Sequence, residues 1–312
     1  MLTYQSVSEL CQLAEQEGRT LSQVILSDQA EQLEQSEQAL YDQMAARLQV
    51  MRESVQTGMD PQLRSASGLS GGDAAKMLRY AAGGGMTGAF VNEAIARALA
   101  TSECNAAMGK IVAAPTAGSC GILPGTILSV LEAGQCSERQ AVMALFTAGG
   151  IGMTIGSRAT LAGAEGGCQA ECGSAAAMAA AALAELRGGT PAQSAHACAM
   201  ALKNQLGLVC DPVAGLVEVP CIKRNAAGVM IAFSSAEMAL AGIESKIPVD
   251  ECIEAMYRVG TALPSSLRET AQGVLSRPRP PETAQGGLAA TPTGTRLKEE
   301  LFGGHTHWRP AP

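Results

Sequence analysis

Apolar residues recur at helical spacing through the first part of the chain. Between Ser8 and Thr57 the sequence is otherwise polar, as in helices that bury only one face. The apolar positions are Leu10, Leu13, Val24, Leu33, Leu40, Met44, Leu48 and Met51. We therefore expect residues 1–64 to form an N-terminal helical arm, a surface helix pair with a wet outer face. An assembly surface is the alternative that this pattern leaves open.

Helical periodicity resumes at Gly88. Small and apolar residues recur with this period over 88–101, 121–133, 138–148, 173–186, 191–206, 225–242 and 249–263. Pro191 and Pro248 stand near predicted helix starts, where proline is tolerated, and Asp73 is placed to cap the helix that follows it. No alternation of strands and helices appears. The sequence predicts an all-α fold, with one compact domain over residues 65–304 and loops rich in glycine and proline.

Composition and charge narrow the class of protein. The chain of 312 residues is 47% hydrophobic but only 3% aromatic, and small side chains favour closely packed helices. A net charge of −7 without a basic block gives no electrostatic footprint for nucleic acid. The most apolar run, Gly173–Leu183, is too short to span a bilayer, and the first residues lack the basic region of a signal peptide. We expect a cytoplasmic protein with no membrane or nucleic-acid partner.

A short duplication marks the C-terminal part. The pentapeptide ETAQG occurs at Glu269–Gly273 and again at Glu282–Gly286. Between the copies lies VLSRPRPP (274–281), which is too rich in proline for a helix or an interior strand. We interpret this segment as an inserted surface loop, and we expect residues 305–312 to form a disordered tail.

Ten cysteines raise the question of metal binding. A reducing compartment disfavours a disulfide framework. Cys168, Cys210 and Cys221 stand out because glycine or proline interrupts the helical pattern around each of them. Their spacing matches neither a ferredoxin run nor a zinc ribbon, so spacing alone favours buried cysteines that act as small hydrophobes. Cys120 and Cys172 lie in glycine-rich loops and are ambiguous, since Cys172 makes a C-x3-C pair with Cys168.

Several long strings decide the family. APTAGSCGILPGT (114–126), GAEGGCQAECGSAAAMAAAALAEL (163–186) and KNQLGLVCDPVAGLVEVPCIKRNA (203–226) closely resemble the alpha chain of bacterial iron–sulfur L-serine dehydratases. LRETAQG (267–273) and GGLAATPTG (286–294) resemble the C-terminal signature of that family. The similarity runs from about Leu69 to Gly304. Cys120 and Cys172 depart from the family pattern, and the inserted segment splits what is otherwise continuous ETAQGGLAATPTG.

The resemblance implies a lyase of amino-acid degradation that deaminates L-serine to pyruvate and ammonia. It implies that Cys168, Cys210 and Cys221 hold three irons of a 4Fe–4S cluster, whose fourth iron is open to substrate and acts as a Lewis acid. In two-chain members a separate beta chain completes the enzyme. An alpha–beta complex is therefore expected.

The residues that would bind serine are chosen by their place near these cysteines. The PTAGSCG loop, with Thr116 and Ser119, opens a predicted helix, so its amides are placed to bind a carboxylate; ordinary helix capping is the equal alternative. Asn204, Arg224 and Asn225 are further candidates to orient substrate.

The general base is left open. Lys203, Glu165 and Asp211 are the candidates in this chain, and the resemblance allows the beta chain to donate the base instead. Two other functions also stay open: a 4Fe–4S hydro-lyase acting on a hydroxy acid, and a non-catalytic iron–sulfur sensor or assembly subunit. A pyridoxal-phosphate enzyme is disfavoured, because no lysine stands in a cofactor-anchoring context.

Overall fold

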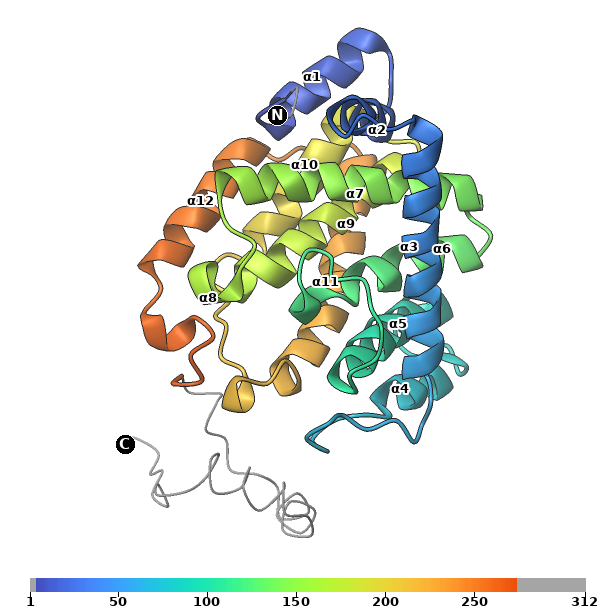
Figure 1. Cartoon of the computed structure of the whole chain (residues 1–312), viewed down its shortest axis with the longest axis vertical. Helices are drawn as coiled ribbons and strands as arrows, with labels where there is room; N and C mark the ends of the chain where they lie inside the picture. Colours follow the sequence, from blue (N-terminus) through green and yellow to red (C-terminus); the bar gives the residue numbers. More distant parts are fainter. Residues whose placement is uncertain (1–3, 274–312) are drawn as a thin grey trace.

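The computed structural model describes residues 4–273, and over this range the chain is helical without a strand (Figure 1). The predicted all-α fold is confirmed. The helices are α1 (Val7–Glu17), α2 (Leu21–Gln32), α3 (Glu37–Gly58), α4 (Asp73–Ala81), α5 (Gly88–Ala106), α6 (Ser129–Glu132), α7 (Glu138–Arg158), α8 (Gly163–Gly166), α9 (Ser174–Leu186), α10 (Pro191–Lys203), α11 (Val219–Leu240) and α12 (Val249–Ala262). Two π-helical turns, Pro124–Leu128 and Gln169–Gly173, lead directly into α6 and α9.

The N-terminal arm consists of three helices where a pair was expected. Each begins at a hydroxyl cap, because Ser6, Thr20 and Ser36 accept a hydrogen bond from the backbone N–H three residues later. α1 packs on α10, α2 on α7 and α3 on α5. Their buried side chains belong to the same hydrophobic cluster as those of the later helices.

α9 lies at the centre of the molecule. Every residue from Ser174 to Ala184 is buried, and most of them are alanines. α7, α10 and α11 pack around this helix, as Figure 1 shows. Such small side chains allow close approach of the neighbouring helices, so α9 acts as a rigid support for the residues at its N-terminal end.

α7 extends well beyond the end expected at Ala148. The following glycines disfavour a helix, but tertiary packing outweighs that preference. A Cβ at Gly150 would come 2.3 Å from Ile25 Cδ1, and one at Gly152 would come 2.9 Å from Met178 Cε. By length and composition alone α7 is apolar enough to span a membrane, but 67% of that stretch is buried inside the protein, as in a core helix.

Two helix starts differ from the prediction. α11 begins at Val219 and not at Asn225, because Pro220 stands in its first turn, where no N–H donor is needed. Asp73 is the first residue of α4 and does not cap it. The cap comes from the buried Glu103 carboxylate of α5, which accepts hydrogen bonds from the N–H of Asp73 at 2.9 Å and of the next residue at 3.2 Å.

The described residues end at Gly273, so the structure bears on only some of the C-terminal predictions. The first ETAQG copy belongs to the described residues. The insertion predicted at 274–281, the second copy at 282–286 and the tail predicted at 305–312 lie outside them.

Candidate active site

The three predicted cluster ligands come together from three segments. Cys168 stands between Gly167, whose φ is 77°, and the π-helical turn Gln169–Gly173. Cys210 lies in the loop after α10, and Cys221, predicted in a loop, lies in the first turn of α11. Their exposed fractions are 1%, 2% and 5%. Burial raises the pKa of both Cys210 and Cys221, the latter to about 12, and the nearby Cys168 raises both further.

Cys168 has a different environment from the other two thiols. Its sulfur lies 3.4 Å from that of Cys172, and the hydrogen bond between them lowers the pKa of Cys168 and raises the pKa of Cys172. Burial opposes the lowering, and the guanidinium of Arg224 supports it. Arg224 is held beside these sulfurs by a bond of 2.8 Å from Nη1 to the carbonyl of Val209. The thiolate form of Cys168 is thus stabilised by a neighbouring cation.

The chemistry of this donor set fits an iron–sulfur cluster. All ten cysteines are free, and Gly163 lets the backbone lie close to the site, because a Cβ there would come 2.6 Å from Glu171 Oε2 and 3.1 Å from Cys210 Sγ. Within residues 4–273 no three His, Cys, Asp or Glu side chains converge closely enough to hold a single metal ion. A cluster makes a different demand, since each thiolate binds its own iron. Three buried thiols on separate elements, next to glycine backbone, satisfy this requirement.

One wall of the site is the loop 115–121. Asn225 holds this loop: its Nδ2 donates to the carbonyl of Gly118 at 2.8 Å and to that of Cys221 at 2.9 Å. Its Oδ1 accepts from the N–H of Gly121 at 2.8 Å. The buried amide therefore ties the loop to the helical turn that carries Cys221.

Glu171 is a buried carboxylate that the sequence analysis did not select. Thr116 Oγ1 donates to Glu171 Oε1 at 2.8 Å and lies 3.2 Å from the hydroxyl of the buried Ser119. Glu171 Oε2 lies 3.8 Å from Cys210 Sγ. Burial raises the pKa of Glu171, and the hydrogen bond from Thr116 opposes this. One signal points to it in the sequence: it is the single charged residue between positions 166 and 184, and an isolated charge in a buried run is rare.

The C-terminal end of the described chain closes over Cys210. Cys210 N donates to the carbonyl of Leu267 at 2.9 Å, and Glu269 N donates to the carbonyl of Cys210 at 2.7 Å. Glu269 has a φ of 61°, which a residue with a side chain adopts only where its surroundings enforce it. A Cβ at Gly273 would come 2.5 Å from the Asp211 carboxylate. The first ETAQG copy therefore lies against the cysteine loop.

Comparison with known proteins gives the family of this chain. The sequence profile of the serine dehydratase alpha chain family matches residues 16–276. The chain belongs to the serine dehydratase alpha chain family. It is 48% identical over 302 residues to a probable L-serine dehydratase alpha chain of Bacillus subtilis, covering 96% of each chain. It is 41% identical over 295 residues to the L-serine dehydratase alpha chain of Peptoniphilus asaccharolyticus, covering 94% of this chain and 97% of that one.

A longer relative shows what the alpha chain family leaves out. An L-serine dehydratase of Escherichia coli is 44% identical over 181 residues, which are 57% of this chain but only 40% of the bacterial protein. The two alpha chains named above thus align with this chain nearly end to end, whereas the alignment with the longer relative covers less than half of that protein.

Within this family, the predicted substrate-binding residues do not all lie together. Thr116, Ser119, Arg224 and Asn225 surround the cysteines through the contacts given above. Asn204 is exposed at the C-terminal cap of α10. Their role in binding stays a prediction, and the amide of Asn225 already has three backbone partners.

The three candidate bases are also dispersed. Lys203 donates to Ser245 Oγ at 2.7 Å, in the segment before α12. Glu165 is exposed and accepts from Thr160 Oγ1 at 2.5 Å. Asp211 is buried beside the cysteine loop, under the first ETAQG copy. The structure thus brings only Asp211 into the closed interior of the site.

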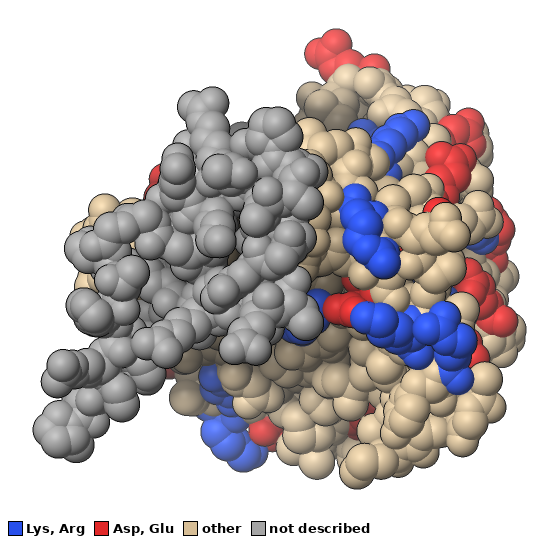
Figure 2. Space-filling model, turned by 90° about the horizontal axis from the view of Figure 1, so that it is seen from below, with Lys and Arg blue, Asp and Glu red and all other residues tan. Residues whose placement is uncertain are grey.

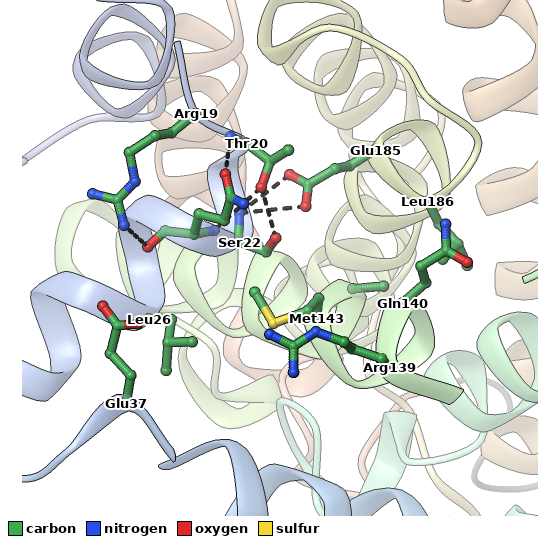
Figure 3. A pocket seen from close by; sticks show the side chains of 12 residues that line it. Arg19, Thr20, Ser22, Leu26, Glu37, Arg139, Gln140, Met143, Glu185 and Leu186 are labelled. Carbon is green, nitrogen blue, oxygen red and sulfur yellow. Dashed lines mark hydrogen bonds between the residues drawn. The ribbon is translucent and has the colours of Figure 1, made fainter. Parts of the chain in front are cut away.

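A cavity of about 470 Å³ lies elsewhere, between α2, α7 and α9 (Figure 3). Figure 3 shows Glu185 pointing at the first turn of α2, where it accepts from Ser22 N at 3.2 Å. Arg139 at the same cavity lies 5.1 Å from the ring centre of Tyr41. These groups cap and brace the arm, and none of the predicted site residues lines this cavity. Glu165 instead lines a smaller cavity of about 280 Å³ together with Arg268.

Proposed function

We propose that this chain is the iron–sulfur subunit of an L-serine dehydratase, which with a beta chain converts L-serine to pyruvate and ammonia. Support comes from the family and from the placement of Cys168, Cys210 and Cys221, three buried thiols of which Cys168 raises the pKa of the other two, with the guanidinium of Arg224 beside Cys168 and Cys221. The reducing conditions that ten free cysteines require fit a cytoplasmic protein.

The reaction removes the α-proton and the β-hydroxyl of serine as water. The aminoacrylate that forms tautomerises to an imine, which water hydrolyses to pyruvate and ammonia. Hydroxide is a poor leaving group. A bound 4Fe–4S cluster on Cys168, Cys210 and Cys221 supplies a Lewis acid for it, with no net redox change.

Binding of the substrate carboxylate falls to Arg224 and the loop 115–121. Arg224 donates from Nη1 to the Val209 carbonyl, and its guanidinium lies beside Cys168, where it is placed to meet a carboxylate. The hydroxyls of Thr116 and Ser119 lie in this loop, 3.2 Å apart, and are our candidates to orient the polar groups of serine. Asn225 keeps this loop at a fixed distance from α11.

Exclusion of water is the task of the segment that covers Cys210. Its two backbone hydrogen bonds to Cys210 seal one side of the site. Lys203 and Glu165 are engaged with Ser245 and Thr160, so the group that takes the α-proton is to be sought in Asp211, which is buried beside the cysteine loop, or in the beta chain.

The test is anaerobic purification of the chain with its beta chain, followed by assays of iron, sulfide and serine-dependent pyruvate. We expect about four irons per alpha chain and pyruvate formation, both lost in Cys210→Ala. Cys198→Ala is the matched control, because Cys198 is equally buried but lies in the middle of α10. A cluster without pyruvate would refute serine as substrate, and a folded anaerobic protein without iron would refute the cluster.

A further inference from the structure

Glu171 is a buried carboxylate without a cationic partner. The residue is 9% exposed, and within residues 4–273 no Lys, Arg or His forms an ion pair with it. Other charged side chains gather at the surface, where Figure 2 shows Lys and Arg beside Asp and Glu on the end of the molecule seen from below. Buried glutamates are rare unless they are paired. The unpaired charge of Glu171 therefore indicates a cation that comes from outside the described chain.

The other two glutamates that are buried in the described part of the chain have stronger partners. Glu103 accepts from two backbone N–H groups, at 2.9 and 3.2 Å. Glu218 accepts from two serine hydroxyls, at 2.8 and 3.0 Å. Glu171 has one such donor, the hydroxyl of Thr116 on Oε1. Its Oε2 has the thiol of Cys210 at 3.8 Å, which is a weak donor.

The weak donor to Oε2 is lost when Cys210 binds iron. A cysteine holds an iron as a thiolate, which has no hydrogen to donate. In the enzyme of the proposed function, Glu171 Oε2 thus stays buried and loses its donor from Cys210. A buried carboxylate oxygen in this position is stabilised by a cation that carries N–H donors.

Arg224 brings a positive charge to the same group of thiols. Its guanidinium lies beside Cys168, whereas Glu171 contacts Cys210. Burial raises the pKa of Glu171 and the charge of Arg224 opposes this rise, so the two groups are close enough to interact. A cation and a carboxylate thus flank the cysteines without forming a salt bridge with each other. Serine carries a carboxylate and an ammonium group on one carbon, so this pair of charges is complementary to an α-amino acid.

Two glycines let the Glu171 carboxylate lie against both the loop 115–121 and α8. A Cβ at Gly118 would come 3.2 Å from Oε1, and one at Gly163 would come 2.6 Å from Oε2. The backbone therefore encloses the carboxylate closely on two sides, and the hydroxyl of Thr116 fixes its orientation. A group held in this way is preorganised to bind a ligand beside Cys210.

We propose that Glu171 binds the α-ammonium group of L-serine and so selects an amino acid over a hydroxy acid. The inference rests on the proposed function, because serine is the ligand. Arg224 meets the carboxylate of the substrate, and Glu171 accepts hydrogen bonds from its ammonium group. A hydroxy acid brings an uncharged hydroxyl to Glu171 instead, and a dicarboxylic hydroxy acid adds a second carboxylate that Glu171 repels.

The experiment compares L-serine with L-glycerate, in which a hydroxyl replaces the ammonium group, on the anaerobic alpha–beta complex. The variant Glu171→Gln removes the charge but keeps an oxygen that accepts from Thr116. Its KM for serine should rise about tenfold or more, because a charge-assisted hydrogen bond is lost. The Ki of L-glycerate, and its Kd measured by calorimetry, should change by less than about threefold, since no such bond is present. The iron content should equal that of wild type.

Glu185→Gln is the matched control. Glu185 stands near the end of α9, about 20 Å along the helical run that begins with the π-helical turn of Glu171. It accepts from the N–H of Ser22 in α2 and does not border the thiols. The control makes the same chemical change and should leave the KM for serine and the Ki of L-glycerate at their wild-type values.

Wild type gives a second test that does not depend on the folding of a variant. Its Ki for L-glycerate should exceed its KM for serine by about tenfold or more, for the same reason. Equal values would overturn the proposed selection, and so would pyruvate formation from L-glycerate as fast as from serine.

The remaining outcomes separate this inference from the proposed function. If Glu171→Gln weakened binding of L-serine and L-glycerate equally, the carboxylate would shape the site without binding the ammonium group. A lower kcat with an unchanged KM for serine would also contradict the inference. Iron-loaded wild type that formed no pyruvate from serine would refute the proposed function, and this inference with it.

Discussion

Asn225→Ala should loosen the site without touching a thiol. The side chain is 1% exposed and holds the loop 115–121 through the carbonyl of Gly118 and the N–H of Gly121, both at 2.8 Å. Its third partner, the carbonyl of Cys221, keeps a helical hydrogen bond within α11 when the amide is removed. Two buried backbone groups are therefore left without their partner.

The cost follows from those two groups. Each buried polar group left unpaired costs about 1–3 kcal/mol, so the substitution should cost about 2–6 kcal/mol. That is a large share of a stability of about 5–15 kcal/mol. Asn225→Asp should be at least as harmful, because its carboxylate would oppose the Gly118 and Cys221 carbonyls. Asn105→Ala is the control: it removes a single contact of 3.4 Å to the same loop and should cost less than about 1 kcal/mol.

The assay combines urea unfolding of the anaerobic protein, iron content, and kcat and KM for serine in the alpha–beta complex. We expect Asn225→Ala to lose stability and iron together, because the loop and the Cys221 turn separate. If it were as stable as Asn105→Ala, the positioning role would be wrong. If it kept stability and iron but lost kcat/KM, Asn225 would contact substrate directly, as the sequence-based prediction has it.

Four further results are expected. Cys168→Ser should lose iron whereas Cys172→Ser should retain it, which iron analysis of the paired variants decides. Gly163→Ala should cost about 1–3 kcal/mol and reduce iron binding, because its Cβ would come 2.6 Å from a buried carboxylate oxygen. Gly149→Ala, with nothing within 4 Å, should leave iron unchanged and stabilise α7 by about 0.5–1 kcal/mol in urea. Burial raises the pKa of Glu185, so its contribution to stability is present at low pH and is lost as pH rises through the folded-state pKa. The free energy of unfolding of Glu185→Gln, measured by urea titration, should therefore increase relative to that of wild type as pH rises.

Helix content followed from the sequence because periodicity reports a buried face directly. Helix ends did not, since distant residues decide them. The cap of α4 is Glu103, which stands far along the chain from Asp73 and cannot be read from a local pattern. The glycines of α7 disfavour a helix in the sequence, and only the folded structure shows that Ile25 fills the space beside Gly150. Such boundaries depend on contacts between helices that periodicity does not contain.

The candidate site was predictable only in part, for a related reason. The spacing of Cys168, Cys210 and Cys221 favoured buried cysteines over metal ligands, and the three are indeed buried. Their glycine and proline context made them stand out, but the resemblance alone assigned them to a cluster. Glu171 was missed because it shares a π-helical turn with alanine and glycine, and only folding places it against Thr116. A lone charge in a buried run would have been the better guide.

α11 connects the cysteines to the loop beside them. Its first two turns carry Cys221, the Arg224 guanidinium beside the thiols and the Asn225 amide that holds the loop 115–121. Because these groups stand on one helix, the loop cannot separate from Asn225 without losing its fixed position relative to Cys221. Loop position and iron binding should therefore be coupled, so substitutions at Asn225 should lower stability and iron content together.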